Sequence, residues 1–223
     1  MNFSELREIC KRKSGYIITL FVANELSLIL TWYLRKTRIS PNQVTIASIF
    51  IAICCACSYA AGEFIIGSVF LLISHVLDCT DGNLARVTGS FSNIGKWLDK
   101  IGDRFCETII LIGVSVYFLE IDGSKLWFSL SLFNGIFLLY YFYIVDIGLA
   151  MGISSPIQNI GRLKINNVSI IWGIVDPFIY GFIIFSSIGL VKVQIVFLSM
   201  LILIGIVYQA IKLMFISSVN SQK

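Results

Sequence analysis

The sequence is poor in charge and in proline, and each scarcity narrows the class of protein. Of its 223 residues only 13% are Asp, Glu, Lys or Arg, whereas 57% are hydrophobic. Together with a mean hydropathy of +0.87, this composition excludes a water-soluble globular domain of this size. Only three prolines interrupt the chain and no low-complexity linker divides it. We therefore expect one compact domain without internal repeats.

The six cysteines lack the spacing of a zinc or disulfide framework. Three share one apolar run and three are scattered: Cys54, Cys55 and Cys57, and Cys10, Cys79 and Cys106. We interpret them as small, polarisable packing residues. Residues 1–15 are charged and contain no apolar stretch before a cleavage site, so no secretory signal is predicted.

Long apolar runs are abundant. Six of them are long enough, at 1.5 Å per helical residue, to cross a bilayer core of about 30 Å. Helices satisfy their backbone hydrogen bonds without water. The sequence therefore predicts an all-α, polytopic membrane protein with six transmembrane helices: Gln43–Gly62, Phe64–Arg86, Ile94–Leu119, Leu126–Met151, Val168–Ile188 and Val193–Met214.

A further segment, Tyr16–Leu34, is nearly long enough to span. At helical spacing its polar residues form one stripe and its apolar residues lie opposite: Asn24, Ser27, Thr31 and Arg35, against Leu26, Ile29, Leu30 and Tyr33. This pattern predicts an amphipathic N-terminal helix that lies in the membrane interface rather than a seventh span.

The positive charges support this topology. With Tyr16–Leu34 lying flat, only Lys125 and Lys192 fall on one side of the membrane. The positive-inside rule makes the other side cytoplasmic, which in a bacterium means the inner membrane. We expect a cytoplasmic segment 1–40, a membrane domain 41–216 and a tail 217–223. The net charge of +4 indicates attraction to anionic lipid headgroups or phosphorylated substrates, not to nucleic acid.

Against this apolar background, four aspartates gather between residues 77 and 104. Asp78 and Asp81 are three apart near the end of one predicted span, and Asp99 and Asp103 are four apart at the start of the next. Each pair shares a helix face, and a turn at Gly89–Asn93 brings the two faces together.

Clustered carboxylates raise each other's pKa unless a cation is bound. Their hard oxygens suit Mg²⁺, Mn²⁺ or Ca²⁺, and two such ions about 4 Å apart form a phosphoryl-transfer site. The alternative is that the acids are solvated at headgroup level and paired with basic neighbours.

Small residues surround the acids. Gly82 lies inside a helix, where it costs about 1 kcal/mol relative to alanine, and Gly95 precedes Asp99 by one turn. Ala85 is also small, and Arg86 offers a planar fork for phosphate oxygens. Together these residues predict a diphosphate pocket with room for a flat base.

The pattern Asp78-x2-Asp81-Gly82-x2-Ala85-Arg86-x8-Gly95-x3-Asp99-x3-Asp103 resembles the signature of the CDP-alcohol phosphotransferases, also called CDP-alcohol phosphatidyltransferases. Six spans with a cytoplasmic amphipathic helix are similar to the family's architecture. The stretch Ile39–Thr45, with Pro-Asn-x-x-Thr before an apolar run, also resembles the family. Locally, Ser40 and Pro41 suit a helix start, and that is the alternative interpretation.

The resemblance implies an enzyme of phospholipid or related glycoconjugate biosynthesis. It transfers a substituted phosphate from a CDP-alcohol, such as CDP-diacylglycerol, to an acceptor alcohol and releases CMP. It implies two divalent ions, Mg²⁺ or Mn²⁺, on the four aspartates, with Asp103 as general base. It also implies a homodimer and these residues around the nucleotide and diphosphate: Asn42, Thr45, Gly82, Ala85, Arg86 and Gly95.

The acceptor and the donor stay open. A phosphorylated polyol could bind to Arg104, Arg162 and Lys164. Arg162 and Lys164 also fit the ordinary positive charges that flank a span on its cytoplasmic side. The segment Trp97–Arg104 resembles the branch of the family that uses inositol-phosphate-type acceptors. The donor is either a membrane lipid or a soluble CDP-alcohol.

Other polar residues lie within the predicted spans. His75 fits either a hydrogen-bond partner of a metal ligand or an interhelical hydrogen bond. Asp176 indicates either function or pairing with a nearby polar group, and Pro177 predicts a kink. Asp146 could line the same cavity, and Tyr140–Tyr143 fits packing and an interface belt.

Two other functions use similar residues. A membrane prenyltransferase also binds diphosphate through aspartates and Mg²⁺, but on well-separated helices and without a need for Gly82, Ala85 and Arg86. A cation transporter would spread its acids across the membrane depth, whereas these four lie at one edge.

Overall fold

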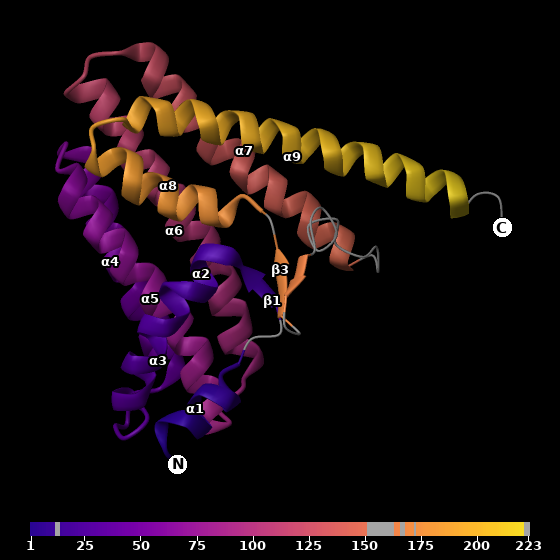
Figure 1. The fold of residues 1–223 in the computed structure, drawn as a ribbon. Coiled ribbons are helices and arrows are strands. Elements are labelled where there is room, and N and C mark those ends of the chain that lie inside the picture. The colour runs from indigo at the N-terminus through magenta and orange to yellow at the C-terminus, as the bar shows by residue number, and fades with distance from the viewer. Residues whose placement is uncertain (12–13, 151–162, 166–167, 172, 221–223) are drawn as a thin grey trace.

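The computed structural model describes residues 1–11, 14–150, 163–165, 168–171 and 173–220. Helices dominate this part of the chain (Figure 1). They are α1 (Phe3–Ile9), α2 (Ile17–Phe21), α3 (Ala23–Leu34), α4 (Pro41–Ala60), α5 (Phe64–Thr88), α6 (Asn93–Glu120), α7 (Lys125–Ala150), α8 (Val175–Ser187) and α9 (Val191–Asn220). Three short strands accompany them: β1 (Ser14–Tyr16), β2 (Leu163–Ile165) and β3 (Val168–Ile171).

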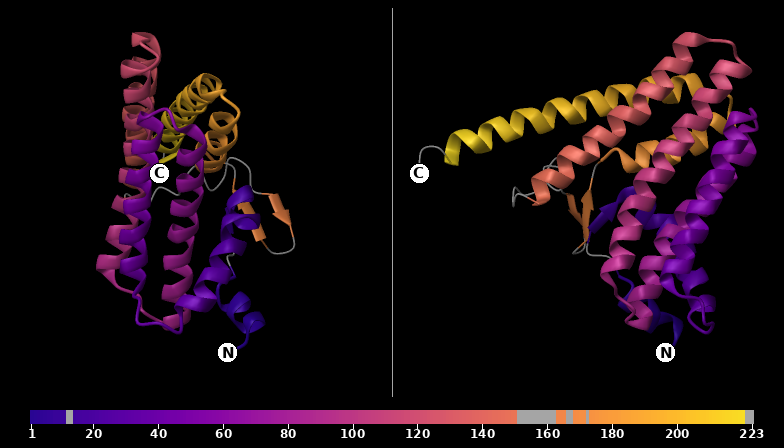
Figure 2. Two further views of the ribbon diagram at one scale, coloured as in Figure 1. Left: turned by 90° about the vertical axis from the view of Figure 1, so that its left-hand side faces the viewer. Right: turned by 180° about the vertical axis from the view of Figure 1, so that it is seen from behind.

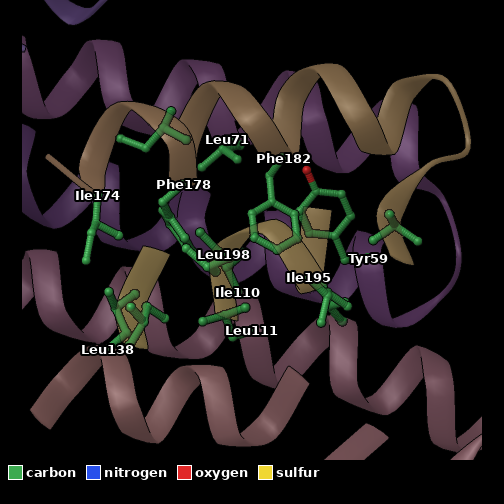
Figure 3. Packing of buried hydrophobic residues seen from close by; sticks show 14 of the residues in the cluster. Tyr59, Leu71, Ile110, Leu111, Leu138, Ile174, Phe178, Phe182, Ile195 and Leu198 are labelled. Atoms are coloured by element: carbon green, nitrogen blue, oxygen red, sulfur yellow. The ribbon is translucent and has the colours of Figure 1, made fainter. Parts of the chain in front are cut away.

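The helices form a bundle in which α4 lies against α5 and α6. α3 and α8 pack against α5, and α7 packs against α6 and α9. The C-terminal end of α9 extends beyond the other helices, as the right-hand view of Figure 2 shows. The core formed by α4 to α9 is aromatic and aliphatic, with Tyr59, Phe118, Phe178 and Phe182 fully or almost fully buried. Figure 3 shows Tyr59, Phe178 and Phe182 within this core.

Within the described residues, length and apolarity select five segments that could cross a membrane: Ile17–Leu34, Pro41–Ala60, Phe64–Thr88, Lys125–Gly148 and Val191–Ile211. The last four coincide with predicted spans, and the other two predicted spans are not among the five. α6 carries the charged residues of the motif and does not meet the criterion, α8 is shorter, and Ile17–Leu34 does meet it. Several apolar helices fit a multi-pass integral membrane protein.

The predicted span Val168–Ile188 is wrong in its first third. Residues 168–171 form β3, the centre of a small sheet of order β1-β3-β2, which accompanies a fold that is otherwise α-helical, as predicted. β3 pairs in parallel with β1 and antiparallel with β2. Its β-branched residues favour a strand.

The helix that follows, α8, begins only at Val175. Pro177 therefore lies in the first turn, where its missing N–H leaves no hydrogen bond unmade. The predicted kink at Pro177 is wrong for that reason.

The stripe predicted in Tyr16–Leu34 faces inward. Asn24, Ser27 and Thr31 are buried, while Leu26 and Ile29 are exposed. α3 packs on α5, and the polar face supplies that contact. The helix therefore turns its apolar side outward, as a helix in contact with lipid does.

Close approach of α4 and α6 depends on Gly113. A Cβ atom at this position would overlap the carbonyl oxygen of Ala56. In lipid, helix association relies on such backbone contact because apolar burial offers little between apolar helices.

We expect Gly113→Ala to lower the midpoint of thermal unfolding in detergent, at a cost of about 1–3 kcal/mol from overpacking. The matched control is Gly135→Ala, whose new Cβ would meet Leu111 at an ordinary 3.6 Å. Equal midpoints for the two variants would contradict the proposed contact.

Candidate active site

A tight turn sets α5 and α6 antiparallel. Gly89 ends α5 with a left-handed φ of 67°, a conformation that suits glycine. Ser92 then caps α6, its hydroxyl accepting a hydrogen bond from the N–H of Gly95 at 2.9 Å. The predicted turn at Gly89–Asn93 is confirmed, and it places the two aspartate pairs on facing helices.

Three of the four carboxylates converge as the spacing predicts. Ligand oxygens of Asp78, Asp99 and Asp103 all lie within 4.8 Å of one another. Asp81 lies outside this group of three. It is buried at 5% exposure, and its Oδ2 accepts a hydrogen bond from Thr45 Oγ1 at 2.5 Å. We call these four residues the aspartate cluster.

The donor set fits a divalent cation. It consists of carboxylate oxygens only, which suits Mg²⁺ or Mn²⁺. One cation of the chain lies close, since Arg104 Nη2 is 3.8 Å from Asp103 Oδ2. Like charges this close repel one another, so a bound divalent ion would stabilise the arrangement.

The start of α4 positions Thr45. Ser40 forms a capping box with Gln43, and Pro41 occupies the first turn, so the predicted helix start is confirmed. Thr45 lies one turn on, buried, where its hydroxyl holds Asp81. In the structure Thr45 therefore acts first as a hydrogen-bond donor to the aspartate cluster.

A cavity of about 270 Å³ opens on one side of the cluster. We call it the Arg86 cavity. It is lined by Asp81, Asp99 and all six residues that the resemblance places around the nucleotide: Asn42, Thr45, Gly82, Ala85, Arg86 and Gly95.

The two glycines keep this cavity open. A Cβ at Gly82 would meet nothing nearer than the Arg86 guanidinium at 3.9 Å, so the space beside it is empty. A Cβ at Gly95 would lie 2.9 Å from Asn42 Oδ1 and would displace that side chain.

Sequence reasoning missed what orients Arg86. Its Nη1 donates to Asn83 Oδ1 at 2.7 Å, and Asn83 Nδ2 donates to Ser27 Oγ at 2.7 Å. Asn83 lies three residues before Arg86, and that spacing was the available signal. Ser27 comes from α3, and no local pattern links it to the motif. Phe91 and Lys96 also line the Arg86 cavity and were not predicted.

A second cavity of about 310 Å³ lies on the other side of the cluster. We call it the Arg104 cavity. Asp78, Asp103 and Arg104 line it, and Thr45 and Asp99 line both cavities. The aspartate cluster therefore separates two spaces that meet at its carboxylates.

Arg104 is held on two sides within its cavity. Its guanidinium carbon lies 3.4 Å from the centroid of the Phe142 ring, and its Nη1 donates to Glu107 Oε2 at 2.6 Å. Glu107 was missed, although it follows Arg104 at a helical spacing of three. Tyr16 also lines this cavity, and burial raises the pKa of its phenol, which keeps the hydroxyl a proton donor.

Some of the remaining predicted residues lie outside the described part of the chain, and the structure places the others. Arg162 and the side chain of Lys164 lie outside the described residues. Asp146 is exposed, pairs with Lys100 at 2.9 Å, and is absent from the described lining of both cavities. Within Tyr140–Tyr143, Tyr141 belongs to the core and Phe142 lines the Arg104 cavity.

Asp176 and His75 are linked through Thr19. Asp176 accepts hydrogen bonds from the N–H groups of Ile18 and Thr19 and from Thr19 Oγ1, the last at 2.7 Å. Thr19 Oγ1 lies 3.1 Å from His75 Nε2. The predicted pairing of Asp176 and the predicted interhelical hydrogen bond of His75 are both confirmed.

These features agree with comparison to known proteins. Residues 38–216 match the CDP-alcohol phosphatidyltransferase family, and the chain belongs to that family. An archaetidylinositol phosphate synthase of Pyrococcus horikoshii is 35% identical over 99 residues, which are 41% of this chain and 53% of that one. A phosphatidylinositol phosphate synthase of Cutibacterium acnes is 30% identical over 102 residues, 44% of this chain and 48% of that one. The chain thus spans about half the length of these relatives.

Solved structures share the fold. The phosphatidylinositol phosphate synthase of Mycobacterium tuberculosis in complex with manganese and citrate has a TM-score of 0.66 at 17% identity, covering 82% of this chain and 87% of that one. The same enzyme with CDP-DAG bound has a TM-score of 0.60 at 16% identity, covering 85% and 92%.

We expect Thr45→Val to weaken Mn²⁺ binding roughly 10- to 100-fold, because partners that orient a metal-binding carboxylate have effects of that size. Titration followed by electron paramagnetic resonance measures it. Thr31→Val is the matched control, since Thr31 is also buried but donates to a carbonyl of its own helix. Unchanged affinity in Thr45→Val would show that Asp81 needs no such partner.

Proposed function

We propose that the protein transfers a substituted phosphate from a CDP-alcohol to an acceptor alcohol and releases CMP. The observation that carries this proposal is the aspartate cluster between two cavities, one of which gathers Asn42, Gly82, Ala85, Arg86 and Gly95. The Arg86 cavity would hold the cytidine diphosphate, with Arg86 and Lys96 facing its phosphates. The Arg104 cavity would hold the acceptor.

Asp103 lines the Arg104 cavity and not the Arg86 cavity, so it faces the acceptor side. It would take the proton of the acceptor hydroxyl as that oxygen bonds to the β-phosphorus. The bond from this phosphorus to the bridging oxygen breaks, and CMP leaves. Divalent ions on the aspartates would supply positive charge to the diphosphate.

We propose a phosphorylated polyol, of the inositol-phosphate type, as the acceptor. Relatives in the family are inositol phosphate lipid synthases, and Arg104 lies beside Asp103. Its contact with Phe142 presents the guanidinium flat, and a phosphate would compete with Glu107 for it. Arg162 and Lys164 would add charge. For the donor we propose a lipid such as CDP-diacylglycerol, as in the fold relative with CDP-DAG bound.

We also propose that α4 to α9 are six membrane spans, with domain bounds 41–216, and that α3 lies in the cytoplasmic interface. The exposed apolar face of α3 supports contact with lipid. Arg86 and Lys96 line one cavity beside the cluster and Arg104 lines the other, and this positive charge supports a cytoplasmic active site. Homodimers, common in this family, are the proposed assembly.

Asp103→Asn should lower CMP release by purified protein roughly 100- to 10,000-fold, because the amide cannot accept the hydroxyl proton. The assay pairs lipid and soluble CDP-alcohols with polyols, phosphorylated polyols, amino alcohols and glycerol phosphate. Asp146→Asn is the control, and it should keep the wild-type rate. Undiminished CMP release in Asp103→Asn would remove the assigned base. Pyrophosphate as product would indicate a prenyltransferase, and metal flux without nucleotide turnover a transporter.

Arg104→Gln should raise the KM for a phosphorylated acceptor roughly 10- to 100-fold, the size expected for a lost hydrogen bond between charged groups. The KM for the CDP-alcohol should stay unchanged, because Arg104 lines only the acceptor side. Lys100→Gln, which removes an exposed lysine paired with Asp146, serves as control. Equal changes in both KM values would contradict the division of the site into two cavities.

A further inference from the structure

A second group of metal-ligand atoms lies beside the aspartate cluster. His75, Asp78 and Cys79 follow each other on α5 at positions that share one face, and one ligand atom from each lies within 4.8 Å of the other two. All three line the Arg104 cavity. This group shares only Asp78 with the group of Asp78, Asp99 and Asp103.

The proton on His75 can be assigned from its neighbours. Thr19 has a single hydroxyl proton, and it is donated to Asp176 at 2.7 Å. Towards His75 Nε2, at 3.1 Å, Thr19 can therefore only accept, so Nε2 carries the proton. In the neutral ring Nδ1 then holds the lone pair that a metal requires.

This arrangement is typical of a metal-binding histidine. Such histidines donate their other ring N–H to a carboxylate or a similar oxygen, which fixes both tautomer and ring orientation. Here Thr19 connects the ring to the buried Asp176, and Asp176 is itself held by backbone N–H groups of α2. The ring of Tyr180 packs edge-on against His75, with centroids 5.9 Å apart. α2, α5 and α8 together fix the imidazole.

We propose that His75, Asp78 and Cys79 form a site for a borderline divalent ion such as Zn²⁺ or Co²⁺. Imidazole nitrogen and thiolate sulfur prefer these ions to Mg²⁺, whereas the all-carboxylate group prefers Mg²⁺ or Mn²⁺. Three protein ligands leave one position of a tetrahedral ion for water from the cavity. Cys79 releases its thiol proton when the ion binds.

The shared Asp78 connects this site to the proposed reaction. An ion bound with His75 and Cys79 would draw the Asp78 carboxylate away from Asp99 and Asp103. If the proposed function holds, Zn²⁺ therefore inhibits CMP release in the presence of excess Mg²⁺, and Cys79→Ser relieves this inhibition. This consequence rests on the proposed function, whereas binding of the ion does not.

The test is titration of the purified full-length protein with Co²⁺ in excess Mg²⁺, read from thiolate-to-cobalt absorption and competed with Zn²⁺. We expect the absorption in the wild type, its loss in Cys79→Ser, and weaker binding in His75→Gln. Cys106→Ser is the matched control, because Cys106 lines the same cavity outside the ligand group. No thiolate absorption in the wild type, or absorption that depends on Cys106 rather than Cys79, overturns the proposal. Neither result depends on turnover, so this proposal and the proposed function fail separately.

A second pair of variants tests the positioning role of Thr19. Thr19→Val should weaken Co²⁺ binding roughly 10- to 100-fold, and Thr19→Ser should restore it, because only a hydroxyl can join Asp176 to His75. A merely structural role would not distinguish valine from serine in this readout. Equal Co²⁺ affinities for the two variants would overturn the relay.

Discussion

The structure depends on holding carboxylates of like charge within 4.8 Å of one another. Such an arrangement repels itself, so the surrounding helices must enforce it until a cation binds. The turn at Gly89 and the cap at Ser92 join α5 to α6, and the close approach of Gly113 to Ala56 holds α6 against α4. The packed helices thus hold the aspartate cluster in an arrangement that would be unfavourable without them.

The aspartate cluster also lies between the Arg86 cavity and the Arg104 cavity. Thr45 and Asp99 line both cavities, whereas Arg86 lines one and Arg104 the other. Each arginine is held by neighbouring side chains: Asn83, itself bonded to Ser27, holds Arg86, and Phe142 and Glu107 hold Arg104. Preoriented arginines lose less conformational entropy when an anion binds. In the proposed reaction this favours two anionic substrates that approach from opposite sides.

The spacing of residues along the sequence correctly predicted features that depend on the geometry of a single helix or turn. The aspartates meet because i, i+3 and i, i+4 residues share a helix face and a short turn reverses the chain. The capped start of α4 was readable for the same reason. Three contacts that escaped prediction join residues far apart in sequence: Ser27 with Asn83, Thr19 with Asp176, and β1 with β3. Two others, Asn83 with Arg86 and Arg104 with Glu107, are three residues apart and had a readable spacing.

One error and one unforeseen contact had a shared cause. Val168–Ile171 belongs to an apolar run that was predicted as a span, but periodicity alone does not distinguish a strand from a helix. The polar stripe of Tyr16–Leu34 predicted an amphipathic helix, but it did not show that Asn24, Ser27 and Thr31 would be buried within the protein. In both cases the sequence showed which residues are apolar but not which neighbour they would contact.

The sheet has a consequence for biosynthesis. Ser14 pairs with Ser169, and Asp176 accepts the backbone N–H of Ile18, so residues 14–19 are tied to residues near the start of α8. These N-terminal residues leave the ribosome early, yet their partners are made only after α4 to α7. The first part of the chain to be synthesised is therefore among the last to reach its final place. The wall of the Arg104 cavity that carries Tyr16 and Thr19 closes only when that late pairing occurs.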